Sequence, residues 1–154
     1  MKLSRLFAAA VALSTMIAAG TIVSPSSVVG DEIRVTVKGL RNDKGRVGCS
    51  LFNGVEGFPR DREKEFREMW VPIHNGSAVC GFIGLPAGTY AVSVLHDENS
   101  DGKMDFNWIG MPTKGYGFSN DAKAMPLPPS FHAAGFEYDG RCLLSISINI
   151  VYWN

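Results

Sequence analysis

The stretch that most constrains the fold of this chain runs from Gly88 to Asp105. Residues Thr89–His96 alternate and are rich in β-branched and aromatic side chains, which predicts a β-strand. Carboxylate and amide side chains follow at once, and a glycine lies among them. A strand that leads directly into a cluster of oxygen ligands is the most informative segment of this sequence.

The acidic segment resembles the first half of an EF-hand calcium loop. Asp97, Asn99 and Asp101 fall at every second position and Gly102 follows, where that loop makes its sharp turn. Position twelve is Trp108 rather than Glu, so the expected affinity for Ca²⁺ is weak, about 10⁻⁴ to 10⁻³ M. The expected ligands are Asp97, Asn99, Asp101, the backbone carbonyl of Lys103, and Asp105. The alternative is an Asx-rich turn that its own backbone satisfies.

Further alternating segments predict strands on both sides of this unit. They are Glu32–Leu40, Arg46–Phe52, Ala78–Ile83 and, as a one-sided antiparallel strand, Arg141–Tyr152. The first two are expected to form a hairpin over the turn at 41–45, and a second turn is expected at Asn75-Gly76. Together these signals predict an all-β antiparallel sandwich of six or seven strands, in a single domain over residues 31–154.

Two segments interrupt the β pattern. Residues Asp61–Glu68 are highly charged, and Phe66, Met69 and Trp70 lie at helical spacing, which predicts a short surface helix. Residues Asn107–Phe131 form a long Gly/Pro-rich loop. Its aromatic side chains are candidates for stacking on a sugar or peptide, and the alternative is a small core that covers one edge of the sandwich. These aromatic residues are Trp108, Tyr116 and Phe118.

The N-terminus has the pattern of a secretory signal peptide. Basic residues precede an apolar run that ends at Gly20, so residues 1–20 are the expected signal, with cleavage anywhere up to residue 30 and a linker over 21–30. Removal of Lys2 and Arg5 leaves 13 basic and 15 acidic residues, a net charge of −2. This balance gives no footprint for nucleic acid. We therefore expect an exported protein, periplasmic or extracellular, with no membrane span after cleavage.

The chain has three cysteines, Cys49, Cys80 and Cys142. Each lies on the apolar side of its strand pattern, so all three are candidates for buried positions. An exported protein permits one disulfide, and the spacing does not choose among the three pairings. We expect at most one disulfide and at least one thiol that is buried and slow to react.

One bacterial family shares a long, ordered series of these motifs. The series comprises Leu85–Val92, His96–Asp105, Gly110-Met111-Pro112, Gly115–Asn120 and Pro129-Ser130-Phe131. In these residues the chain resembles the domain of unknown function 2141 family over about Glu32–Tyr152. It departs from the family pattern at Lys114, where an acidic residue is more usual. The resemblance implies an exported protein with a prealbumin-like sandwich, similar to carboxypeptidase regulatory domains, and no established activity.

Two functions from different classes follow. The first is a non-enzymatic exported module, stabilised by Ca²⁺, with a role in binding or in the cell envelope and a glycan, peptide or envelope protein as partner. The second is a small periplasmic hydrolase-type enzyme that uses His96 with adjacent carboxylates. The chain lacks a Gly-x-Ser-x-Gly elbow and a phosphate-binding loop, which favours the first. His96, Trp108, Tyr116 and Phe118 are the candidate ligand-binding residues.

Overall fold

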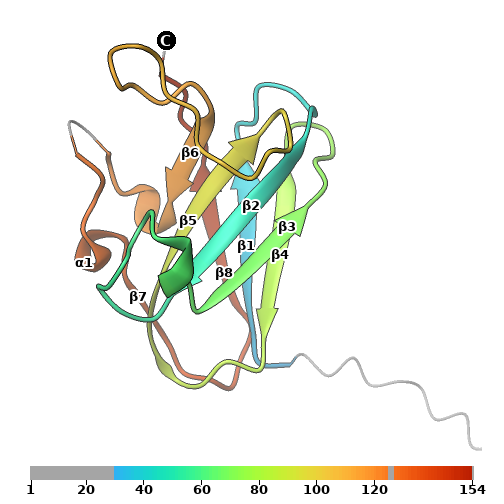
Figure 1. Cartoon of the computed structure of the whole chain (residues 1–154). Helices are drawn as coiled ribbons and strands as arrows, with labels where there is room; N and C mark the ends of the chain where they lie inside the picture. Colours follow the sequence, from blue (N-terminus) through green and yellow to red (C-terminus); the bar gives the residue numbers. More distant parts are fainter. Residues whose placement is uncertain (1–29, 125–126, 154) are drawn as a thin grey trace, which may run out of the picture.

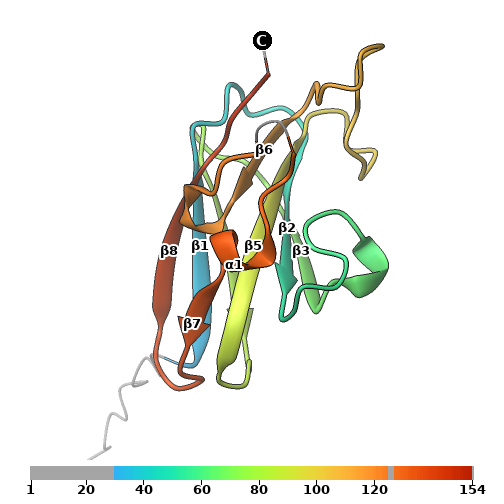
Figure 2. The same cartoon turned by 90° about the vertical axis from the view of Figure 1, so that its left-hand side faces the viewer.

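Alternating apolar residues place one face of each main strand in a core that lies between two sheets (Figures 1 and 2). The computed structural model describes residues 30–124 and 127–153, so the predicted signal peptide and nearly all of the linker lie outside the described residues. The strands are β1 (Glu32–Lys38), β2 (Arg46–Phe52), β3 (Arg67–Val71), β4 (Ala78–Ile83), β5 (Gly88–Asp97), β6 (Gly115–Phe118), β7 (Phe136–Tyr138) and β8 (Leu144–Asn149). The short helices are η1 (Arg62–Lys64), η2 (Ser119–Asp121) and α1 (Phe131–Ala134).

The two sheets differ in size. The smaller has the order β4-β1-β8, and the larger has the order β3-β2-β5-β6, with β7 beside β5. The ten-residue strand β5 is the central strand of the larger sheet. Strand β2 pairs along one side of it, while β6 and β7 pair with different halves of the other side. The predicted all-β sandwich is confirmed. Its prealbumin-like character stays a prediction.

Two predicted pairings were wrong. Strand β2 does not form a hairpin with β1, because the turn between them carries the chain from one sheet to the other. The apolar faces of β1 and β2 therefore face each other across one core. In a hairpin within one sheet, both apolar faces would need another element to cover them. Strand β8 pairs with β1 in parallel rather than antiparallel orientation. Its predicted one-sided pattern is nevertheless present, since Ile148 and Ile150 are buried while Ser147 and Asn149 are exposed.

The predicted surface helix is present only as the three residues of η1, and the prediction that Met69 and Trp70 dock it was wrong. Only η1 is helical there, and Met69 and Trp70 belong to strand β3, where they pair with Cys49 and Gly48 of β2. Pairing with a neighbouring strand outweighed a helical spacing that rested on three residues. The Gly/Pro-rich loop, for its part, contains strand β6. Its glycines hide the strand signal in the sequence, and they are needed because a Cβ atom on Gly115 would lie 2.4 Å from the Tyr152 ring.

A disulfide links the two sheets through the core. Cys49 of β2 and Cys80 of β4 are both fully buried and are joined to each other. Cys142 is free and exposed, so the expectation that the unpaired cysteine is buried was wrong. The residue lies just before β8, where the chain has not yet entered the sheet and the alternating pattern no longer predicts burial.

A second apolar cluster covers the outer face of the larger sheet. Phe52, Phe118 and Phe131 surround the ring of Phe58, with ring centroids 5.3 to 6.1 Å from it in edge-to-face arrangements. Strand β5 is therefore buried on both faces in this region, with Ala91 beneath the cluster. The small-core alternative for the aromatic residues of the Gly/Pro-rich loop thus describes the position of Phe118.

Candidate functional site

The acidic loop after β5 is folded around the ammonium group of Lys114. The Nζ atom lies 2.8 Å from Asp97 Oδ1, 2.6 Å from Asp101 Oδ1 and 2.7 Å from the Lys103 carbonyl oxygen. It also lies 3.2 Å from Asp105 Oδ2. Four of the five predicted calcium ligands therefore converge on one point, and the group at that point is an amine.

Local backbone geometry explains why the loop closes in this way. Gly102 has φ of 76°, a left-handed conformation that glycine adopts without strain, and its N–H donates to Asp97 Oδ2 at 2.8 Å. Asn99 differs from the prediction, because its Nδ2 donates to Asp101 Oδ2 at 3.0 Å and to Asp105 Oδ2 at 3.3 Å. The amide thus ties the loop together rather than turning its oxygen toward the centre.

Charge and burial make Lys114 the dominant group of the loop. Its side chain is 4% exposed and that of Asp97 is fully buried, so their ion pair is shielded from solvent. Burial by itself lowers the pKa of Lys114, but hydrogen bonds to the three carboxylates outweigh it and raise the pKa above its ordinary value. The same hydrogen bond from Lys114 holds the pKa of Asp101 at about 2.

Carboxylate and carbonyl oxygens are the ligand types that Ca²⁺ prefers, but it usually takes six to eight of them and four converge here. The distances of 2.6 to 3.2 Å are those of charge-assisted hydrogen bonds to an ammonium group, and its position is the one that an ion would need. The loop as folded therefore does not fit Ca²⁺ unless Lys114 moves away. Calcium binding stays a prediction, and Lys114 is its competitor.

His96 lies on the core side of β5 and is fully buried. Its Nε2 faces the carbonyl of Lys44 at 3.0 Å, so Nε2 must carry the proton, and Nδ1 accepts from the Tyr152 hydroxyl at 2.6 Å. Both nitrogens are thus engaged in structural hydrogen bonds, an arrangement that gives the hydrolase hypothesis no support.

Glu98 points away from Lys114, into a separate cluster. It forms an ion pair with Arg41, whose guanidinium lies 4.5 Å from the centroid of the Tyr152 ring. Asn42 Nδ2 donates to the same carboxylate at 2.7 Å. The hydrogen bond from Arg41 is the main reason that the pKa of Glu98 falls to about 2. This cluster anchors the turn between β1 and β2 to the start of the acidic loop.

Two arginines join the acidic loop to the larger sheet. The guanidinium groups of Arg46 and Arg62 lie 4.1 and 5.6 Å from the centroid of the Trp70 ring. Arg46 donates to the carbonyl of Ser100 at 3.4 Å, and Arg62 donates to that of Gly102 at 2.7 Å. These contacts could not be predicted from the sequence, because the three side chains come from three separate segments.

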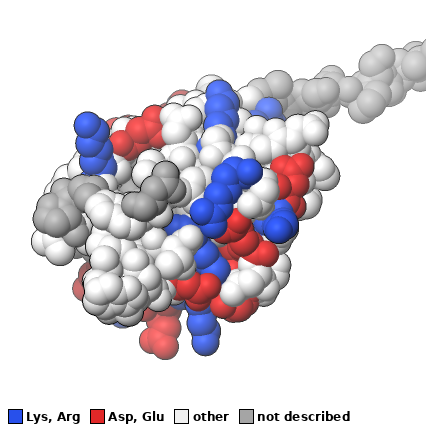
Figure 3. All heavy atoms as spheres, turned by 90° about the horizontal axis from the view of Figure 1, so that it is seen from above, with Lys and Arg blue, Asp and Glu red and all other residues white. Residues whose placement is uncertain are grey.

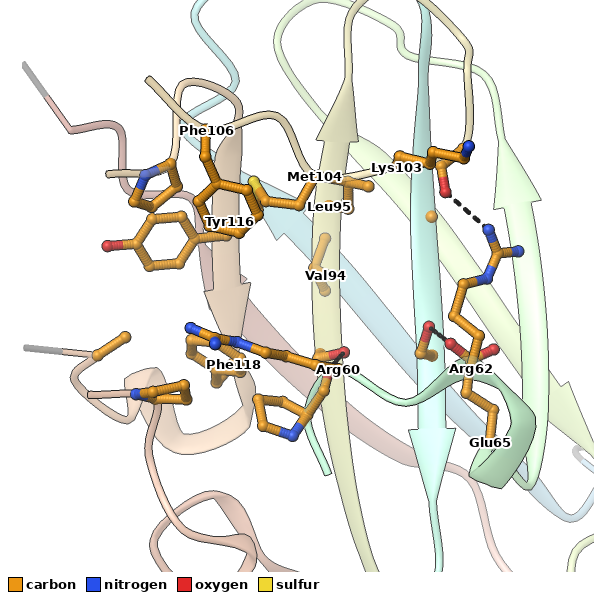
Figure 4. Close-up of a pocket in the computed structure, with 18 of the residues that line it drawn as sticks. Arg60, Arg62, Glu65, Val94, Leu95, Lys103, Met104, Phe106, Tyr116 and Phe118 are labelled. Atoms are coloured by element: carbon orange, nitrogen blue, oxygen red, sulfur yellow. Dashed lines mark hydrogen bonds between the residues drawn. The ribbon is translucent and has the colours of Figure 1, made fainter. Parts of the chain in front are cut away.

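The outer face of the larger sheet contains a groove of about 500 Å³, which we call the outer groove (Figure 4). Its floor has small side chains at Gly48, Ser50 and Ser93, and the floor is completed by Leu95. The residues around this floor have larger side chains, which form the sides of the groove. The larger side chains on the sides of the groove include Trp70 and Arg62 near β3, Tyr116 and Phe118 of β6, Met104 and Phe106 of the segment after β5, and Pro59, Arg60, Leu127 and Pro128.

Five charged side chains line this groove, and they are Arg60, Arg62, Lys103, Glu65 and Glu68. Figure 4 labels Arg60 and Phe118 among the side chains that line the groove. Within residues 30–124 and 127–153, Arg62 has a carboxylate partner in Glu68, whereas Arg60 has none within 4.0 Å. Apolar side chains and an unpaired guanidinium group therefore line the same groove. Neither Arg60 nor Lys114 was among the site residues predicted from the sequence.

The predicted ligand-binding residues separate in space. Tyr116 and Phe118 both line the outer groove. Trp108 is 95% exposed at the tip of the loop that follows Phe106, outside the groove, and His96 is buried on the opposite face of the sheet. Two of the four candidates thus belong to one site.

Seen from above, this end of the molecule carries Lys and Arg next to Asp and Glu, beside a largely uncharged area (Figure 3). The described residues contain no group of three or more His, Cys, Asp or Glu side chains that is arranged to hold a metal ion. They also contain no helix that is long and apolar enough to cross a bilayer.

The fold and its surface define a small β-sandwich with a ligand-sized groove beside a lysine-centred acidic loop. Residues 35–142 match the model of the domain of unknown function 2141 family, described as an uncharacterized protein conserved in bacteria. The match covers more than half of the chain, so the protein belongs to this family, as the resemblance implied. Comparison with curated proteins and with solved structures finds no significant match.

Proposed function

We propose that this protein is an exported, non-enzymatic binding module that holds a small amphipathic anion in the outer groove. The observation that carries the proposal is the groove itself, whose volume of about 500 Å³ lies within the range of small-molecule sites, about 300 to 1,000 Å³. A mostly apolar lining with few polar groups is the usual composition of such sites.

Export is supported by chemistry as well as by the N-terminal pattern. A disulfide in a fully buried position persists in an oxidising compartment and is rare in the cytosol of mesophiles. The periplasm and the extracellular space are such compartments. The signal-like residues 1–20 and the Cys49–Cys80 bond therefore support the same location.

The ligand class follows from the two kinds of surface in the groove. Aromatic, methionine and proline side chains favour an apolar body, since burial of apolar surface contributes about 25 cal/mol per Å². Arg60 favours an anionic group, because a guanidinium binds carboxylates and phosphates through two parallel hydrogen bonds. A molecule with an apolar body and one anionic end satisfies both surfaces.

Two dyes separate these contributions: 1-anilinonaphthalene-8-sulfonate is apolar and anionic, and Nile red is apolar and neutral. We expect both dyes to bind the folded protein with increased fluorescence. Leu127→Asp places a charge on a wall residue that is 74% exposed, so it should weaken both dyes without unfolding the protein. Ile83→Asp is the matched control, because Ile83 is 72% exposed on β4 and lies outside the groove.

Arg60→Met tests the anionic contact. It should weaken the sulfonate dye about tenfold, the equivalent of about 1.4 kcal/mol, and leave Nile red unchanged. Arg141→Met, at an exposed arginine outside the groove, is the control for the loss of one positive charge. Equal binding of the sulfonate dye to the Arg60 and Arg141 variants would exclude an anion at Arg60, and unaltered binding to Leu127→Asp would exclude the groove as the site.

A further inference from the structure

We infer that the Lys114 ammonium is the resident cation of the acidic loop, so that the wild-type loop closes without a metal ion and becomes a metal site only when this amine is removed. The inference is independent of any ligand in the outer groove. It rests on the position of one buried side chain, whose Nζ atom is surrounded by the oxygens of the loop.

The ammonium makes the contacts that an ion would make. Three carboxylates and one backbone carbonyl lie within 3.2 Å of Nζ, and these oxygens come from Asp97, Asp101, Lys103 and Asp105. An ammonium has three hydrogens, and three of these contacts lie between 2.6 and 2.8 Å. The three hydrogens suffice for these three contacts, and the contact with Asp105, at 3.2 Å, is the longest of the four.

Charge balance explains why the loop needs a cation at this point. Three carboxylates so close together repel one another when nothing positive lies between them. Arg46 lies 3.6 Å from the buried Asp97, whereas Lys114 contacts all three carboxylates. Removal of the amine would leave the buried Asp97 without its closest positive partner, which is a costly state for a buried charge.

Placement in the chain gives the tethered amine a second effect. Lys114 directly precedes β6, whose Tyr116 and Phe118 form one side of the outer groove, while Met104 of the acidic loop forms part of another. The contacts of Nζ therefore fasten the acidic loop to the start of β6. A free ion could order the loop, but it would not fasten the loop to the start of β6, because an ion has no covalent bond to that strand.

The test is thermal melting of the full mature chain in EDTA and in 10 mM Ca²⁺, with calorimetric titration of Ca²⁺ at 25 °C. For wild type, we expect the same Tm in both solutions and no saturable heat. For Lys114→Met, we expect a lower Tm in EDTA, a rise of several degrees in Ca²⁺, and saturable binding. Lys103→Met is the matched control, because its side chain is exposed and only its backbone carbonyl contacts Lys114, so it should behave like wild type.

Lys114→Asp adds a carboxylate at the same position and covers the case in which the methionine variant does not fold. It should fold in Ca²⁺ and unfold at a much lower temperature in EDTA. Saturable Ca²⁺ binding by wild type would overturn the inference in favour of a conventional calcium loop. Failure of both Lys114 variants to respond to Ca²⁺ would overturn it as well, since the loop would then be only a turn.

Discussion

The disulfide between Cys49 and Cys80 allows a quantitative prediction about stability. The two residues are 31 positions apart, and cross-linking them restricts the unfolded chain by an entropy that corresponds to about 3.7 kcal/mol at 25 °C. Domains of this size have total stabilities of about 5 to 15 kcal/mol. Reduction of this one bond should therefore remove a large share of the stability while leaving the native contacts almost unchanged, since both thiols stay in the core.

The measurement compares oxidised and reduced protein in the Cys142→Ala background, which removes the exposed thiol and prevents exchange. We expect the Tm to fall by about 10 to 20 °C on reduction, from the usual relation between stability and Tm for domains of this size. The Cys142→Ala change alone should shift Tm by little, because the side chain is exposed. Mass spectrometry establishes the redox state of each sample. A fall of less than about 3 °C on complete reduction would refute the reasoning that the bond restricts the unfolded chain.

Two further predictions concern titratable groups. Native protein should react rapidly with one equivalent of a thiol reagent, at Cys142, and should expose two more thiols only after reduction and denaturation; rapid reaction of three thiols in the native, unreduced state would contradict the disulfide. Arg41 and Lys114 hold the pKa of Glu98 and of Asp101 at about 2, against ordinary values of 4.5 and 3.8. A carboxyl group with a lowered pKa stabilises the fold above its unfolded pKa and loses that contribution as the pH falls through its folded pKa, so the urea midpoint should hold down to about pH 4.5 and decline between there and pH 2. Glu98→Gln should make that decline shallower, and an identical pH profile for the variant would contradict the assignment.

Local patterns in the sequence were sufficient for most strands but not for their partners. Alternation at Arg46–Phe52 and Ala78–Ile83 predicted the strands with their bounds, and the strand predicted at Glu32–Leu40 ends two residues earlier, at Lys38, because a period of two follows directly from burial of one face. The pairing of β2 with β5 rather than with β1 could not be read in the same way. It depends on which arrangement buries both apolar faces together, and that is a property of the whole chain.

In the candidate site, too, local features followed from the sequence and long-range contacts did not. By itself the sequence determined that oxygens at Asp97, Asp101, Lys103 and Asp105 would converge, because a strand, alternate carboxylates and a glycine turn lie within one short segment. Only the tertiary structure decided what lies between them. Lys114 enters from nine residues beyond Asp105, and Arg60 reaches the outer groove from a segment before β3. The physical reason is range: contacts within one turn follow from backbone geometry, whereas Lys114 reaches the loop only because β6 pairs with β5 in the larger sheet, with Gly115 opposite His96.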